Sequence, residues 1–349
     1  MKILWVPFSA QSRVASVRLR CLYPAAWLRA HGHEVTVTGR GMQLSAADVA
    51  IFSKRYDAPA LAAAQQLRSR GTRVVLDICD NHFYASQEHA GFRERRDSLL
   101  RMIECATGIV AASEELQRVI GANSPKAHVA AVISDPIEDL HELRRVAPWR
   151  DRLGWLAWSR YRARVLQLRH AGAVGLVWFG NHGVDYSSQG GMGDLRKLRS
   201  LLERHARSRP VYLSVISNSA ERFAELVGDW GITTLYLDWR ARYFGAALSL
   251  HEVALIPVEK NPFTLCKTAN RLALALAHGL AVIADSIPAY EPYRDVSALD
   301  DWDEGLTRYL SDPARRRQDA QRGRERVMSD MSLDRIGSAW QQALERCCS

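Results

Sequence analysis

The chain has 349 residues, of which 47% are hydrophobic and 24% are charged, and this composition is that of an ordinary globular protein. Its length exceeds that of a typical domain, so we expect two domains. The sequence has no run of about 18 apolar residues, which excludes a membrane-spanning helix, and its start lacks the long apolar core of a signal peptide. We therefore expect a cytoplasmic protein.

The net charge of +9 is concentrated in one segment. Residues 141–170 hold eight arginines against Glu142 and Asp151. A basic block of this kind predicts an acidic partner, such as nucleic acid, anionic lipid or a phosphorylated substrate. A solvated helix face would explain the same pattern. The six cysteines form no CxxC pair, so we expect neither a zinc site nor a disulfide framework.

The first half of the chain alternates short apolar runs with amphipathic ones, which predicts strands alternating with helices. The predicted strands are Met1–Pro7, Glu34–Thr38, Ala47–Phe52, Arg73–Leu76, Gly108–Ala112 and Ala127–Ile133. The predicted helices are Leu22–Ala30, Ala58–Arg70, Arg96–Ala106 and a helix after the cap residue Ser113.

The second half repeats this order. Its predicted strands are Val174–Phe179, Val211–Ser217, Thr233–Asp238, Val253–Pro257 and Leu280–Ala284. Its predicted helices are a helix through about His205, then Ala220–Val227, Arg240–Leu248, the helix before Gly279, Pro313–Arg326 and Leu333–Cys347.

Two successive runs of this kind predict an α/β protein with two Rossmann-like, doubly wound domains. We expect an N-terminal domain at residues 1–140, a basic linker at 141–172 and a C-terminal domain at 173–330. Residues 331–349 would form a last helix that packs back on the N-terminal domain.

Open parallel sheets bind ligands beyond the C-terminal ends of their strands, so the polar residues that follow each strand are candidate site residues. In the first half these are Ser9, Arg13, Ser16, Arg18, Asp77, Asp80, Asn81 and His82. In the second half they are Gly180, Asn181, Asn218, Arg240, Lys260, Lys267, Asn270 and Arg271.

Four of the residues in the second half are cations, namely Arg240, Lys260, Lys267 and Arg271. Cations beside a helix N-terminus suit a diphosphate, so we expect this set to hold a nucleotide diphosphate. A carboxylate partner for Arg271 is the alternative, because an arginine in an apolar helix is costly unless it is paired. The sequence has neither GxGxxG after its first strand nor GxxxxGK[ST], which disfavours a dinucleotide dehydrogenase and a P-loop enzyme.

The segments KILWVP, HGHEVTV, GIVAASEEL and AHGLAVIAD resemble GT-B-fold glycosyltransferases of the retaining, mannosyltransferase-like type. The resemblance covers most of the chain and implies two domains that face each other across a cleft. The family's donor-binding segment carries two glutamates, and Cys266 and Leu274 stand in their places here. The donor nucleotide therefore stays open among UDP, GDP and CMP.

The resemblance also implies roles for individual residues. Lys267, Arg271, Asn270, Asn181, Gly180, Lys260, Asn218 and Arg240 would bind the donor. Ser9, Arg13, Ser16, Arg18 and Asn81 would bind the acceptor. His82, with Asp77 or Asp80, would lie at the reacting hydroxyl. Either carboxylate could instead cap the next helix, Asn181 could be a turn residue, and Arg13 and Arg18 could simply be solvated.

The function that follows is transfer of a sugar from a nucleotide-sugar donor to a hydroxyl of a glycan or lipid-linked glycan, with retention implied by the resemblance alone. Neither a metal nor another cofactor is expected, because cations would offset the charge of the leaving diphosphate. The alternatives are a nucleotide-sugar epimerase, a non-catalytic sugar-nucleotide binder and a nucleic-acid-binding protein.

The segment 141–170 also contains Trp149, Leu153 and Leu156 at helical spacing, with Trp155 and Trp158 nearby. It could lie peripherally on an anionic membrane at the inner face and meet a lipid-linked acceptor there. An interdomain linker whose aromatic residues pack on the second domain is the alternative.

Overall fold

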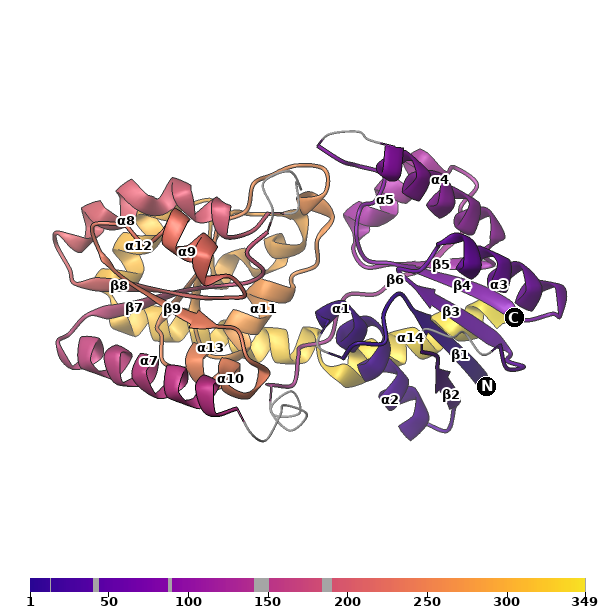
Figure 1. Cartoon of the computed structure of the whole chain (residues 1–349), viewed down its shortest axis with the longest axis horizontal. Coiled ribbons are helices and arrows are strands. Elements are labelled where there is room, and N and C mark those ends of the chain that lie inside the picture. The colour runs from indigo at the N-terminus through magenta and orange to yellow at the C-terminus, as the bar shows by residue number, and fades with distance from the viewer. Residues whose placement is uncertain (13, 40–43, 87–89, 141–150, 184–189, 349) are drawn as a thin grey trace. The chain divides into compact units, whose positions relative to one another are not determined.

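A computed structural model describes residues 1–12, 14–39, 44–86, 90–140, 151–183 and 190–348, and the chain forms two compact units (Figure 1). Unit 1 comprises Met1–Ile137, Asn261–Asn270 and Ser329–Ser349. Unit 2 comprises Glu138–Lys260 and Arg271–Met328. The segment 261–270 therefore belongs to unit 1, although its place in the sequence predicted the C-terminal domain.

Unit 1 is built on a parallel sheet of six strands in the order β2-β1-β3-β4-β5-β6. The strands are β1 (Lys2–Pro7), β2 (Glu34–Val37), β3 (Val49–Ser53), β4 (Arg73–Ile78), β5 (Gly108–Ala111) and β6 (Val129–Val132). Nearly every residue of β1, β3 and β4 is buried, because helices cover both faces of a parallel sheet. The chain leaves β1 toward β2 and returns to β3, so the strand order reverses between β1 and β3.

The helices of unit 1 are α1 (Ala15–Val17), α2 (Tyr23–Ala30), α3 (Ala58–Ser69), α4 (Ala90–Cys105), α5 (Glu114–Asn123) and α14 (Leu333–Cys348), with one wider turn at Arg18–Leu22. Ser113 caps α5 by accepting a hydrogen bond of 3.2 Å from the amide of Leu116. On α14, Trp340 is fully buried, with its ring 5.0 Å from that of Trp5 on β1. The last helix therefore packs on the sheet of unit 1.

Unit 2 repeats the architecture with the strand order β12-β11-β10-β7-β8-β9. Its strands are β7 (Val174–Phe179), β8 (Val211–Ser217), β9 (Thr233–Asp238), β10 (Val253–Ile256), β11 (Ala281–Ala284) and β12 (Ala298–Leu299). All described pairings in both sheets are parallel. The order reverses between β7 and β10, and such a reversal is where ligands bind in doubly wound folds.

The helices of unit 2 are α7 (Arg152–His170), α8 (Arg199–Ala206), α9 (Ala220–Leu226), α10 (Ala241–Leu248), α11 (Asn270–Ala277), α12 (Trp302–Ser311) and α13 (Pro313–Asp330). Asn270, the first residue of α11, and the last residues of α13 belong to unit 1. Short 3₁₀ helices lie at Met192–Leu198, Thr264–Cys266 and Pro288–Val296.

The expected linker at 141–172 is a long helix of unit 2 where the structure describes it. Asp151 caps α7 by accepting a hydrogen bond of 2.9 Å from the amide of Gly154. Tyr161 and Val165 are buried on the inner side of α7. Residues 141–150, with part of the basic block, lie outside the described residues.

Candidate active site

In unit 1, the polar residues after β4 form a largely buried network of ion pairs. The fully buried Asp77 on β4 accepts hydrogen bonds from the guanidinium of Arg20, which also lies 3.5 Å from Asp135. Burial alone would lower the pKa of Arg20, but attraction to Asp77 and Asp135 outweighs it and raises this pKa. Asp77 therefore stabilises unit 1, and its burial contradicts the predicted role at the acceptor hydroxyl.

Asp80 lies between two lysines, because both Lys54 and Lys267 form ion pairs with it. Burial would raise the pKa of Asp80, but Lys267 and Lys54 together hold it well below its usual range. The ammonium group of Lys267 also lies 4.2 Å from the centre of the Phe263 ring. Lys267 therefore has a carboxylate partner within unit 1, which contradicts the prediction that it is a free diphosphate ligand.

His82 lies beside this carboxylate. The Tyr56 hydroxyl contacts Nδ1 of His82. Burial lowers the pKa of His82 to about 4, despite the attraction of Asp80, so the imidazole is neutral at neutral pH. A neutral imidazole of this kind can exchange hydrogen bonds with a hydroxyl group.

The segment 261–270 is fixed to unit 1 by four further hydrogen bonds. The side chain of Asn81 donates to the carbonyl of Pro262 at 2.8 Å, and Ser113 donates to the carbonyl of Cys266 at 2.7 Å. Asp135 accepts from Thr268 at 2.8 Å and from Asn270 at 3.2 Å. Asn81 and Asn270 thus hold this segment, rather than the acceptor and donor that the sequence analysis assigned to them.

The predicted acceptor residues near the N-terminus do not form one group. Arg18 is buried and donates to the carbonyl of Ser12 at 2.6 Å, and Ser9 accepts from the amide of Gln11 at 3.2 Å. Ser16 is half-buried on α1. Arg13 lies outside the described residues.

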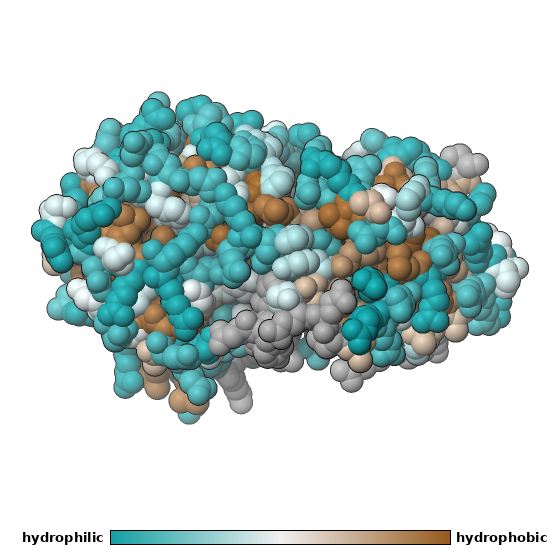
Figure 2. Space-filling model, turned by 90° about the horizontal axis from the view of Figure 1, so that it is seen from above, coloured by the Kyte–Doolittle hydropathy of each residue, from teal (hydrophilic) through white to brown (hydrophobic). Residues whose placement is uncertain are grey.

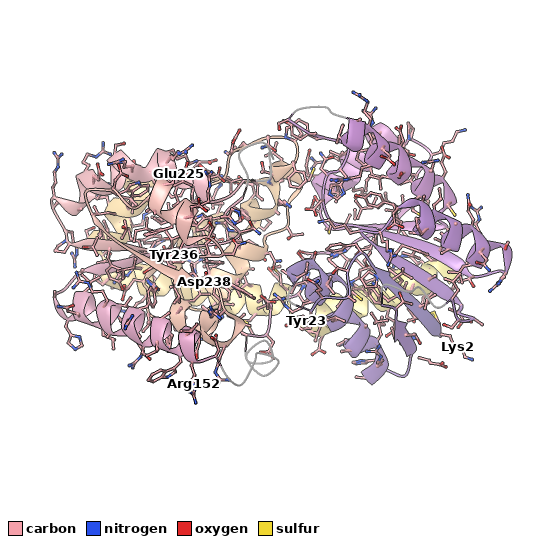
Figure 3. All side chains as sticks on the ribbon, in the orientation of Figure 1. Lys2, Tyr23, Arg152, Glu225, Tyr236 and Asp238 are labelled. Carbon is pink, nitrogen blue, oxygen red and sulfur yellow. The ribbon has the colours of Figure 1, made fainter. Side chains whose placement is uncertain are left out.

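In unit 2, two of the predicted cations are already paired. Arg240 lies 2.9 Å from Asp151 and 3.4 Å from Asp238, and Figure 3 shows Asp238 near Tyr236, whose hydroxyl donates to it at 2.9 Å. Lys260 lies 2.8 Å from Asp300. The expected rim of four free cations is therefore wrong, since Arg240, Lys260 and Lys267 each have a carboxylate within 4 Å.

Arg271 differs from these three cations. Its Nε and Nη2 atoms have no exposed surface and no hydrogen-bond partner among the described residues, although the residue as a whole is half-buried. Its guanidinium carbon lies 5.3 Å from the centre of the Trp178 ring. Burial lowers the pKa of Arg271, and Tyr290 and Asp194 oppose this shift only in part. A buried cation with unmet donors is costly, and an anionic ligand would satisfy it.

The surroundings of Arg271 lie at the reversal of strand order in unit 2. Trp178 is the penultimate residue of β7, and Gly180 follows this strand. A methyl group at Gly180 would lie 3.7 Å from the guanidinium carbon of Arg271, so the glycine keeps the approach to it clear. This is the position where doubly wound folds bind their ligands.

The loop after β7 is ordered by two asparagines. Asn181 accepts from the amide of Gly183 at 3.0 Å, as a turn residue does. Asn218, after β8, accepts from the amide of His182 at 3.0 Å. Both side-chain oxygens are thus used to shape the loop beside Gly180.

Sequence analysis missed Trp178, Asp194 and Tyr290, which surround Arg271. Trp178 lies inside the apolar run VGLVWF, whose pattern indicates only a buried strand. Its place at the end of the strand, two residues before Gly180, was the available signal. Among the described residues, no three His, Cys, Asp or Glu side chains gather as metal ligands.

No protein-family model matches the sequence, and no curated protein matches it. Solved structures do match. The E. coli trehalose-6-phosphate protein bound with UDP-2-fluoro glucose shares 10% identity at a TM-score of 0.67, over 100% of this chain and 99% of that one. The α,α-trehalose-phosphate synthase (UDP-forming) from Burkholderia vietnamiensis shares 9% identity at a TM-score of 0.66, and the match covers 100% of this chain and 97% of that one.

The chain has the GT-B fold. A third GT-B protein, TarM from S. aureus, in complex with UDP, shares 10% identity at a TM-score of 0.58, and the match covers 84% of this chain and 55% of TarM. The predicted fold class of two Rossmann-like units is thereby confirmed. At such low identity the likeness carries the fold and no residue roles.

Proposed function

We propose that the chain is a glycosyltransferase that moves a sugar from a nucleotide-sugar donor to a hydroxyl of a glycan or lipid-linked glycan, with retention of configuration. Unit 2 would bind the donor and unit 1 the acceptor. The observation that carries this proposal is the buried guanidinium of Arg271, whose Nε and Nη2 atoms have no hydrogen-bond partner among the described residues, at the strand-order reversal of a GT-B unit.

Arg271 would bind the diphosphate of the donor. Its buried Nε and Nη2 atoms are donors without acceptors among the described residues, and phosphate oxygens suit the planar guanidinium. Trp178 also holds the guanidinium by a cation–π contact. A positive charge fixed in this way stabilises the diphosphate as it leaves, and we propose that transfer needs no metal.

His82 is the best supported of the three predicted catalytic residues. It is neutral at neutral pH, and Tyr56 contacts Nδ1, which leaves Nε2 for a hydrogen bond with an acceptor hydroxyl. Asp80, held ionised between Lys54 and Lys267, would keep the region polar. A lipid-linked acceptor would bring the protein to the inner face of the membrane as a peripheral protein.

The donor nucleotide can be identified by thermal shift with UDP, GDP, CMP, ADP and dTDP. The E. coli neighbour is bound with UDP-2-fluoro glucose and TarM with UDP, so UDP is the first to test. One nucleoside diphosphate should raise the melting temperature of the wild type but not of Arg271→Ala. Arg199→Ala, which removes a half-buried arginine paired with Glu203 and Asp229, is the matched control and should keep the shift.

The thermal-shift assay and a turnover assay with the nucleotide sugar together separate the proposal from its rivals. If no nucleotide raises the melting temperature, or if Arg271→Ala keeps the full shift, the proposed donor site is wrong. If the donor sugar is converted into an isomeric sugar without any added acceptor, the protein is an epimerase. If it binds without reacting over a panel of glycan acceptors, it is a non-catalytic binder.

A further inference from the structure

The N-terminal end of α7 exposes an apolar cluster. Leu153 is 78% exposed, Trp155 is 56% exposed and Leu156 is 44% exposed. The described residues include seven exposed large hydrophobic side chains, and three of these seven lie within residues 153–156. On the face shown in Figure 2, by contrast, hydrophilic residues predominate and hydrophobic ones appear in separate groups.

The inner side of α7 packs on unit 2, and this packing fixes the direction in which the exposed cluster points. Trp158 stacks on Tyr243 of α10, with ring centres 5.6 Å apart and planes 10° apart. The Tyr161 hydroxyl lies 3.2 Å from Nε2 of the buried His251. Because these side chains anchor the inner side of the helix, Leu153 and Leu156 face away from unit 2. The predicted packing of the aromatic residues therefore holds for Trp158 but not for Trp155.

The exposed leucines and Trp155 are surrounded by positive charge. Helix α7 contains no Asp or Glu, and Arg152, Arg160 and Arg162 are exposed with no ion pair among the described residues. Arg160 lies four residues after Leu156 and seven after Leu153, on the same side of the helix. Figure 3 shows Arg152 at the outer edge of α7, away from the strands of unit 2. We call Leu153, Trp155, Leu156 and these three arginines the α7 surface.

We infer that the α7 surface docks on an anionic lipid membrane. Leucine side chains enter the boundary between headgroups and acyl chains, tryptophan prefers that boundary, and arginines pair with lipid phosphates. No described helix is long and apolar enough to cross a membrane, so the contact is peripheral. It extends the proposed function by placing the acceptor at a lipid surface.

The charge and the apolar side chains of the α7 surface favour anionic lipid over a second copy of the chain and over a nucleic acid. A second copy of the chain would bring two sets of unpaired arginines together, which repels. A nucleic acid would accept the arginines but would leave Leu153 and Leu156 without an apolar partner. Anionic lipid offers an apolar phase to the leucines and Trp155 and phosphate groups to the arginines.

The test is flotation of the full chain with vesicles of phosphatidylcholine alone or mixed with phosphatidylglycerol. We expect binding to the mixed vesicles that weakens as salt rises. Trp155→Ser combined with Leu156→Ser should weaken binding by about tenfold or more, because it removes most of the inserted apolar area. Arg160→Gln combined with Arg162→Gln should reduce the preference for anionic vesicles.

The matched control is Met328→Ser combined with Leu333→Ser, which removes two exposed apolar side chains outside the α7 surface and should leave binding unchanged. All of these positions are exposed, and unchanged melting temperatures would show that the variants fold. Absence of binding, equal binding to both vesicle types, or equal losses in control and test variants would overturn the inference. Salt-sensitive RNA binding that survives the Trp155 and Leu156 substitutions, or dimers that these substitutions abolish, would overturn it in favour of another partner.

None of these substitutions touches Arg271. A chain that binds UDP but not vesicles would refute the membrane inference alone. A chain that binds vesicles but no nucleotide would refute the proposed donor site alone.

Discussion

Arg271 is the residue on which the donor site depends, because its charge is buried without a hydrogen-bonding partner in the described part of the chain. The other predicted cations form ion pairs with carboxylates, and such pairs need no ligand. Sequence alone could not separate these cases, since apart from Asp238, two residues before Arg240, the carboxylate partners lie 40 or more residues away in the chain. Lys267 and Asp80, for example, are 187 residues apart.

Replacing Arg271 with Met should separate function from stability. Met retains much of the side-chain volume and removes a cation that is costly to bury. We expect the free protein to unfold at the same temperature or higher, while binding of the nucleoside diphosphate is lost. Calorimetric unfolding with and without nucleotide measures both effects. A large loss of stability without nucleotide would mean that Arg271 has a structural partner.

His251 should make the protein less stable in mild acid. Burial lowers its pKa from 6.5 to about 4, and its ring contacts Ser214 and the carbonyl of Ala247. Between these pH values the unfolded chain takes up a proton that the folded chain does not, so the free energy of unfolding falls as pH drops from 6.5 to 4. The loss should approach about 3 kcal/mol at ~1.4 kcal/mol per pH unit.

Urea unfolding across this pH range checks the prediction. His251→Gln should reduce the fall in stability, with His82 still contributing to it, whereas His170→Gln, at an exposed position of α7, should leave it unchanged. An unchanged pH dependence in His251→Gln would show that other groups cause the acid sensitivity.

At the scale of elements, the sequence predicted the buried strands best. The observed bounds of β7, β8 and β9 are those expected from their apolar runs. Strands β7 and β8 are buried along their whole length, and a strand buried on both faces leaves a continuous apolar pattern. Helix α7 was missed as an element of unit 2 because its arginines suggested a linker. Segment 261–270 was assigned to the wrong unit, because its ties to Asn81, Ser113 and Asp135 are long-range contacts without a local pattern.

Thr268→Val should loosen segment 261–270. It removes the hydroxyl that donates to Asp135 at 2.8 Å and keeps the shape of the side chain. A hydrogen bond to a charged acceptor contributes roughly 1.5–3 kcal/mol, so a loss of about 2 kcal/mol in unfolding free energy is expected. Urea unfolding at neutral pH is the measurement.

The matched control for this variant is Thr307→Val. The Thr307 hydroxyl donates to the carbonyl of Asp303, a neutral acceptor, on an exposed part of α12. Thr307→Val should lower the free energy of unfolding clearly less than Thr268→Val does. Equal losses would show that the hydrogen bond to Asp135 contributes no more than one to a neutral acceptor.

At the scale of the whole molecule, two parallel sheets with reversed strand order give the GT-B fold at about 10% identity to its structural neighbours. The repeated strand–helix pattern predicted this fold class, because layers of secondary structure follow from hydrophobic periodicity. The donor site needed the structure, since it depends on one arginine whose buried nitrogens have no hydrogen-bond partner in the described part of the chain. The predicted cleft between the units stays a prediction.

The most direct test of the account is titration calorimetry of UDP and UMP against the wild type and Arg271→Met. UDP and UMP differ by one phosphate group, and Arg271 is proposed to bind the diphosphate. We predict that the wild type binds UDP more tightly than UMP, and that Arg271→Met removes this difference. Equal affinities in the wild type, or a preference for UDP that survives in Arg271→Met, would contradict the account.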